Sequence, residues 1–205
     1  MNNLHIDGYA FLRKWLFPYP PLLVRDIREG MTAGKQEFTV RDTCGLAKRV
    51  LQMFPTHRYG GAVFRLTPAT CQMMDPHCEF ELTSKLAVTP DDKIPLTMLV
   101  ALDDYVAVDL WPGSHRDIRK TRQEDMPRIE EYQARLFLYE GDAIVMRGDL
   151  VHGGVRGNNH KQCVLMVYID YPDFPRDRLD SFVLYREPNG DMRAAMMQNK
   201  PMLRN

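Results

Sequence analysis

Two histidines and one glutamate in this sequence could together hold a metal ion. His77 and Glu79 flank Cys78 at the start of a run, residues 77–82, that predicts a β-strand. Side chains two positions apart on a strand point to the same face, so we expect His77 and Glu79 to converge while Cys78 faces away. The pair alone is a weak signal, because an ion pair on an edge strand would show the same residue types at the same spacing.

A third donor, His152, follows the turn Arg147-Gly148-Asp149 and stands directly before two glycines. Glycines beside a histidine let backbone and ligands approach closely. On its own, His152 could equally be a core histidine bonded to a backbone carbonyl. Added to His77 and Glu79, it completes two imidazoles and one carboxylate. This facial set suits non-haem Fe(II) and leaves coordination positions for a chelating cosubstrate and O2.

A cation downstream of His152 would suit such a cosubstrate. A dicarboxylate that chelates iron through its keto-acid end needs a positive charge for its far carboxylate. Lys161 opens the apolar run 163–169, and Arg156 lies in the turn before it. We favour Lys161, because a strand would anchor it whereas Arg156 sits in a glycine-rich turn, but both residues stay open.

The other histidines offer one rival site. His115 and Asp117 also have the spacing of a facial pair, but they follow Pro112-Gly113, where stabilising a turn is the simpler role. His5 lies near the terminus and His57 lies in a Pro-Thr-His-Arg turn. We expect both to be exposed polar residues rather than ligands.

The elements that must position these donors are mostly short strands. From residue 62 onward, apolar or alternating runs are separated by Gly, Asp and Pro turns, which predicts an antiparallel sandwich or barrel. The expected strands cover residues 62–66, 77–82, 96–102, 135–139, 143–146, 164–169 and 182–185. Before them, residues 9–12 suggest a short strand, and residues 22–27 and 42–54 have the apolar spacing of helices. The tail from Asp191 has no period and is expected to form a short helix or to fray.

The composition is that of an ordinary globular protein. The 205 residues, 44% hydrophobic and 26% charged, suit a single domain over residues 1–205 and exclude disordered, collagen-like and coiled-coil classes. Basic and acidic residues number 27 each, so charge does not indicate a nucleic-acid partner. The sequence predicts no membrane span or signal peptide. Four cysteines without CxxC spacing argue against a zinc ribbon and favour a reducing, intracellular location such as the cytoplasm.

Several segments resemble the phytanoyl-CoA dioxygenase-like family, in order along nearly the whole chain. Residues 99–104 (LVALDD) and 111–116 (WPGSHR) are similar to the family's ALDD and PGSHR signature. The family's HxD pair precedes this signature by about the distance at which His77-Cys78-Glu79 stands here. The family's GD…H stretch and its following basic residue are matched by Gly141-Asp142, His152, Asn158 and Lys161, and its opening DGYxxL by residues 7–12.

The resemblance implies a mainly β, double-stranded β-helix fold (jelly-roll, cupin-like) with flanking N-terminal helices. It implies an Fe(II)/2-oxoglutarate-dependent oxygenase (hydroxylase), which couples decarboxylation of 2-oxoglutarate to C–H oxidation of a small-molecule substrate. His77, Glu79 and His152 would be the metal ligands, and Lys161 or Arg156 would hold 2-oxoglutarate.

Three departures from the family pattern keep other hypotheses open. Glu79 stands where the family has Asp, Lys161 stands where it has Arg, and residues 105–109 replace its ENG segment. The alternative is a non-catalytic double-stranded β-helix binding protein whose metal site has decayed. A third possibility is a metal-dependent cupin such as an isomerase, which would need no 2-oxoglutarate clamp. Nothing in the sequence selects a substrate or an oligomeric state.

Overall fold

The fold is given by a computed structural model, which describes residues 2–41, 45–67, 76–79, 89–116, 133–154, 162–173, 182–186 and 192–196. The helices are α1 (Asn2–Ile6), α2 (Pro21–Thr32) and α3 (Leu46–Met53), with a 3-10 turn η1 (Asp91–Lys93). The strands of the first half are β1 (Tyr9–Leu12), β2 (Glu37–Val40), β3 (Arg58–Thr67), β4 (His77–Cys78), β5 (Leu96–Ala101) and β6 (Val106–Leu110). Those of the second half are β7 (Ala134–Leu138), β8 (Ala143–Arg147), β9 (His152–Gly154), β10 (Gln162–Asp170), β11 (Phe182–Arg186) and β12 (Met192–Met196).

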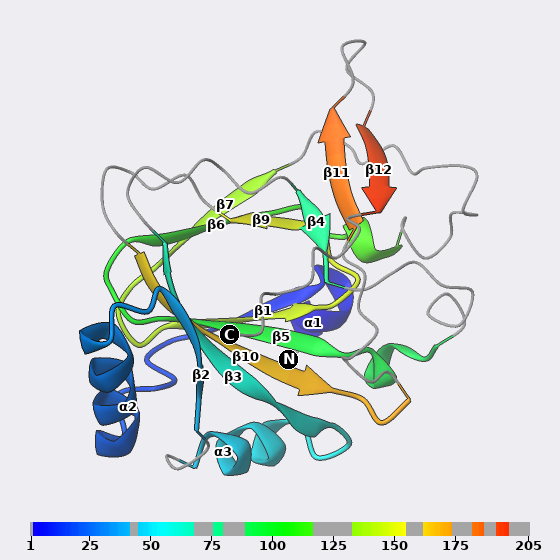
Figure 1. The fold of residues 1–205 in the computed structure, drawn as a ribbon. Coiled ribbons are helices and arrows are strands. Elements are labelled where there is room, and N and C mark those ends of the chain that lie inside the picture. The colour runs from blue at the N-terminus through cyan, green and yellow to red at the C-terminus, as the bar shows by residue number, and fades with distance from the viewer. Residues whose placement is uncertain are drawn as a thin grey trace.

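The strands form two antiparallel sheets that face each other (Figure 1). The first sheet has the order β1-β8-β5-β10-β3-β2, and the second has the order β12-β11-β4-β9-β6-β7. From β3 to β6 and from β7 to β11, strands that follow one another in the chain lie in different sheets, so the chain winds back and forth between the two layers. This topology confirms the predicted double-stranded β-helix.

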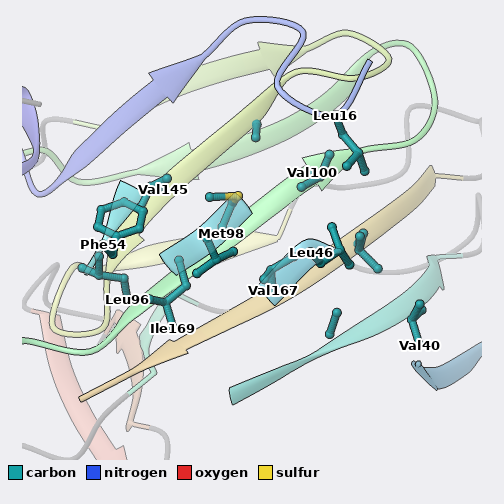
Figure 2. Close-up of a cluster of buried hydrophobic side chains, with 14 of the residues drawn as sticks. Leu16, Val40, Leu46, Phe54, Leu96, Met98, Val100, Val145, Val167 and Ile169 are labelled. Carbon is teal, nitrogen blue, oxygen red and sulfur yellow. The ribbon is translucent and has the colours of Figure 1, made fainter. Parts of the chain in front are cut away.

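A hydrophobic core lies on the outer face of the first sheet, under the N-terminal helices. Leu165, Val167 and Ile169 of β10 point to this side, where Leu46 of α3 and Leu23 of α2 are fully buried. Figure 2 shows this cluster, and Figure 1 places α3 below β3 and α2 beside β2. The predicted flanking helices therefore cover one face of the first sheet and leave its other face to the second sheet.

The inner face of the same sheet carries the alternate residues, as the two-residue period of a strand requires. Val164 and Met166 of β10 pack with Ile144 of β8 and with Val108 and Leu110 of β6 in a second cluster between the sheets. The parity of each strand thus decides which side chains enter the space between the sheets.

Most predicted elements are confirmed, and two corrections have a physical reason. The strand at residues 9–12 and the helix that ends before Pro55 form as expected. We did not predict β6, because Asp109, which is buried in the structure, interrupts its apolar run. The tail was expected to be helical or frayed, but residues 192–196 form β12, paired with β11. Residues 42–44, the start of the expected helix, lie outside the described residues.

No helix in the described ranges has the length and hydropathy needed to span a membrane.

Candidate metal centre

The structure brings His77, Glu79 and His152 to one place between the sheets. His77 on β4 is paired directly with His152 on β9, and the two rings lie 4.5 Å apart. Oε1 of Glu79 lies 3.4 Å from Nε2 of His152 and 3.9 Å from Nε2 of His77. In the part of the chain that the structure describes, these three residues form the group whose donor atoms all lie within 4.8 Å of one another. All three side chains are less than one-fifth exposed.

His152 is oriented by its own backbone neighbourhood. Its Nδ1 donates a hydrogen bond to the carbonyl oxygen of Leu150 at 3.0 Å. With Nδ1 protonated, Nε2 carries the lone pair and faces Glu79, as a metal-binding imidazole requires. The two roles considered from the sequence, a core histidine bonded to a carbonyl and a metal ligand, are therefore compatible in one residue.

Cys78 lies between the donors His77 and Glu79 in the sequence, and its side chain points away from them. It is buried at 2% exposure, and its Sγ donates to the carbonyl oxygen of Asp149 at 3.6 Å. Burial, with the negative charges of Asp149 and Glu79, raises the pKa of this thiol. Cys78 thus has a structural role beside the centre and is not one of its donors.

The turn formed by Gly148, Asp149 and Leu150 contacts the residues of the centre through three successive carbonyl groups. The carbonyl of Gly148 accepts the backbone N–H of Glu79 at 3.0 Å. The carbonyl oxygen of Asp149 accepts a hydrogen bond from Sγ of Cys78, and the carbonyl oxygen of Leu150 accepts one from Nδ1 of His152. One turn therefore sets both the backbone position of Glu79 and the ring orientation of His152.

A buried ion pair holds this turn in place. Nε and Nη2 of Arg147 donate to the two carboxylate oxygens of Asp149, each at 2.8 Å, and the side chains are 1% and 0% exposed. Nη1 of Arg147 reaches Asp91 of η1 at 3.1 Å. The charges of Asp149 and Asp91 outweigh the effect of burial, so the pKa of Arg147 is raised. From the sequence, we read residues 147–149 only as a turn.

The WPGSH segment acts on the residue next to His152. Val151 donates its N–H to Oγ of Ser114 at 3.0 Å, and its carbonyl accepts the N–H of Trp111, also at 3.0 Å. Gly113 between them has φ +81°, a conformation that favours glycine. The segment that carried the sequence resemblance therefore anchors the strand that presents His152.

The other predicted residues lie elsewhere. His115 is buried, its Nε2 faces the carbonyl of His5 at 3.4 Å, and it is not in the three-residue cluster. Its rival partner Asp117 lies outside the described residues, as do Lys161 and Arg156. His5 is exposed as expected, whereas His57 is half-buried and bonds to the carbonyl of Ile94.

The donor set fits a divalent transition metal. Metal bonds to imidazole nitrogen and carboxylate oxygen are about 2.1 Å long, so one ion can bridge donors up to about 4 Å apart. The separations of 3.4 and 3.9 Å from Glu79 fall within that range. Two neutral imidazoles and one carboxylate with open positions are the set that non-haem Fe(II) takes.

Comparison with solved structures finds the same fold in several proteins. The non-heme alpha ketoglutarate dependent epimerase SnoN from nogalamycin biosynthesis is 14% identical, with a TM-score of 0.59 over 89% of this chain and 83% of SnoN. AviO1 from Streptomyces viridochromogenes Tue57 is 15% identical, with a TM-score of 0.63 over 85% of this chain and 94% of AviO1.

A third similar structure is HygX from Streptomyces hygroscopicus, solved with nickel and 2-oxoglutarate bound. It is 14% identical, with a TM-score of 0.61 over 84% of this chain and 86% of HygX. What these proteins share with the chain is the fold. No protein-family model and no curated protein matches the sequence.

Proposed function

We propose that this protein is an Fe(II)/2-oxoglutarate-dependent oxygenase that acts on a small molecule. The observation that carries the proposal is the convergence of His77, Glu79 and His152 within 4.8 Å, inside a double-stranded β-helix. SnoN and HygX support it, since SnoN is described as alpha ketoglutarate dependent and HygX was solved with 2-oxoglutarate.

In this proposal each residue of the cluster has one task. His77 and His152 bind the metal through Nε2, and Glu79 binds it through a carboxylate oxygen. When bound, Fe(II) and 2-oxoglutarate supply the oxidising chemistry: O2 and 2-oxoglutarate are consumed, succinate and CO2 are released, and a substrate C–H bond becomes C–OH. The hydrogen bond from His152 to Leu150 holds the ring in the ligand tautomer, and the apolar residues between the sheets exclude water.

The remaining assignments follow from the sequence. We keep Lys161, with Arg156 as the alternative, as a cation for 2-oxoglutarate, and residues 1–205 as a single domain. An intracellular, cytoplasmic location fits the thiol of Cys78, which is free.

Metal binding is the first test. Purified apoprotein should take up about one Fe(II), Mn(II) or Co(II) per chain, measured by calorimetry and elemental analysis, and His152→Ala should abolish this uptake. His5→Ala is the matched control, because His5 is an exposed histidine outside the cluster. Stoichiometric binding by His152→Ala would contradict the proposed ligand set.

Substitutions of Glu79 distinguish an oxygenase from a double-stranded β-helix binding protein with a decayed metal site. Glu79→Ala should lose turnover, because the metal then lacks its protein anion. Glu79→Asp should keep metal binding, more weakly than the wild type, and measurable turnover, because it retains the carboxylate on a side chain one methylene shorter. Succinate formed from 2-oxoglutarate without added substrate is the readout. Wild-type protein that binds neither metal nor 2-oxoglutarate would favour the binding protein, and one that binds metal alone would favour a cupin of another activity.

A further inference from the structure

A cavity separate from the metal centre lies on the outer side of the first sheet, beside α2. Its volume is about 440 Å³, within the range of about 300–1,000 Å³ that small-molecule sites have. Phe64 of β3, a residue of the outer core, forms part of its lining. The helix α2, which Figure 1 places beside β2 and away from β4 and β9, contributes an apolar wall of Leu23, Val24, Ile27 and Met31. The cavity is therefore mainly apolar, and no residue of the metal centre lines it.

Part of this apolar wall is in contact with solvent. Val24 and Met31 are 39% and 45% exposed, whereas Leu23 is fully buried. Removing apolar surface from water is favourable, so a ligand with an apolar body would gain free energy by covering these side chains. The wall thus indicates the character of most of the ligand.

Two carboxylates give one part of the cavity a negative potential. Asp103, in the turn after β5, and Tyr19, before α2, both line the cavity. Burial, then the charge and hydrogen bond of Glu140 and the charge of Asp103, raise the pKa of Tyr19. Both carboxylates therefore act on a ring in the lining. Among the residues that the structure describes, no lysine or arginine forms an ion pair with Asp103 or Glu140.

The carboxylate of Asp103 is held in position with one oxygen left for a ligand. Its Oδ2 accepts the backbone N–H of Cys163 at 3.1 Å, and the side chain is half-buried. The other charged side chain in the lining is Arg28 of α2, which is exposed. A charge in water attracts an ion weakly, whereas a half-buried carboxylate with a second one nearby attracts it more strongly. Charge complementarity thus favours a cationic ligand over an anionic one.

We infer that this cavity is a second binding site, which takes a small amine with an apolar body. The ammonium group donates to Asp103, and the body packs against Val24 and Met31 of α2. The site lies outside the metal centre, so amine binding does not depend on the proposed oxygenase activity.

Three probes with one body and different head groups test the inference. They are 4-phenylbutylamine, 4-phenylbutan-1-ol and 4-phenylbutanoate, titrated into the full chain by calorimetry at neutral pH. The amine should bind about 10-fold more tightly than the alcohol, the lower end for a hydrogen bond between charged groups, and the carboxylate should bind more weakly than the alcohol. Asp103→Asn keeps an oxygen for the N–H of Cys163. It should abolish the preference for the amine and change the affinity for the alcohol by less than about twofold.

Matched controls locate the site. Asp104→Asn removes the neighbouring carboxylate, which does not line the cavity, and should leave the preference intact. Val24→Trp should fill the cavity and weaken binding of the amine and the alcohol at least about 10-fold. Leu22→Trp should not, because Leu22 is also 39% exposed on α2 but does not line the cavity.

The thiol of Cys163, which lines the cavity, gives a second readout. Saturating 4-phenylbutylamine should slow its alkylation by iodoacetamide, followed by peptide mass spectrometry. Equal binding of the three probes, or tightest binding of the carboxylate with its loss in Arg28→Met, would overturn the inference. Loss of amine binding in His152→Ala would place the amine at the metal centre and would also overturn it. A protein that binds the amine as expected but takes up no metal would contradict only the proposed function.

Discussion

The ion pair between Arg147 and Asp149 gives the sharpest test of how the fold positions the metal centre. We consider the variant Asp149→Asn, which preserves shape but removes the charge. Asp149 is 0% exposed and accepts two hydrogen bonds from Arg147. The asparagine amide has an NH2 group in place of one carboxylate oxygen, and this group cannot accept a hydrogen bond. The buried guanidinium of Arg147 therefore loses one of its two hydrogen bonds to residue 149. Because the turn at residues 148–150 carries the carbonyls that fix Glu79 and His152, we expect the metal site to loosen.

The size of the expected loss in stability follows from the burial of the Arg147–Asp149 ion pair. Breaking a buried ion pair by removing one partner costs about 3–5 kcal/mol. Asparagine keeps one acceptor and Asp91 still contacts Arg147, so we expect the lower end, about 3 kcal/mol. For a domain of this length that is a fall in Tm of about 6–12 °C, and a protein of ordinary stability remains folded at 25 °C. Metal affinity should fall about 10- to 100-fold, as it does when a group that orients a metal ligand is lost.

The assay measures metal affinity by calorimetry at 25 °C and the free energy of unfolding by urea denaturation. The double variant Arg147→Met/Asp149→Leu removes both charges, so stability should return toward that of the parent while metal affinity stays low. Asp109→Asn is the matched control, because Asp109 accepts the same fork from Arg135 on the outer face of the second sheet. Unchanged metal affinity in Asp149→Asn, at the expected loss of stability, would refute this account.

Three further predictions follow from neighbouring contacts. Gly8→Ala should cost about 1–4 kcal/mol in urea denaturation, because Gly8 has φ +86° and an added Cβ would lie 2.6 Å from Leu150 and 2.7 Å from His115; an equally stable variant would contradict this. Burial, and then the charge of Arg147, lower the pKa of His115, so the unfolded chain takes up the proton first and stability falls as pH drops below about 6.5. His115→Asn should flatten the stability curve between pH 8 and 5, and an unchanged slope would argue otherwise. Iodoacetamide should label Cys78, whose thiol is buried with a raised pKa, only after unfolding, as read by mass spectrometry.

The fold could be predicted because most strands are short apolar runs between Gly, Asp and Pro turns. Residues 143–146, for example, lie between the turns at residues 140–142 and 147–149, and they belong to β8, which is buried on both faces. Strand β6 was missed because Asp109 interrupts its apolar run. The tail strand β12 depends on its pairing with β11, which is a long-range contact that no local pattern reveals.

The centre could be predicted only as far as local spacing reaches. The two-residue period of an expected strand suggested that His77 and Glu79 converge, and the chemistry of the donors suggested His152 as their partner. In the structure they do converge, but Glu79 lies in the bend after β4. The direct pairing of His77 with His152 depends on sheet register. Register is set by the whole sheet, so a contact that depends on register cannot be predicted from any one segment of the sequence.

The glutamate in place of the family's aspartate has a local explanation in the structure. Strand β4 ends at Cys78, and Glu79 lies in the bend that follows, where Gly148 fixes its backbone N–H. From that position its carboxylate reaches Nε2 of His152 and of His77, which a side chain one methylene shorter would approach less closely from the same backbone. The longer side chain therefore has a local explanation as reach from beyond the strand end.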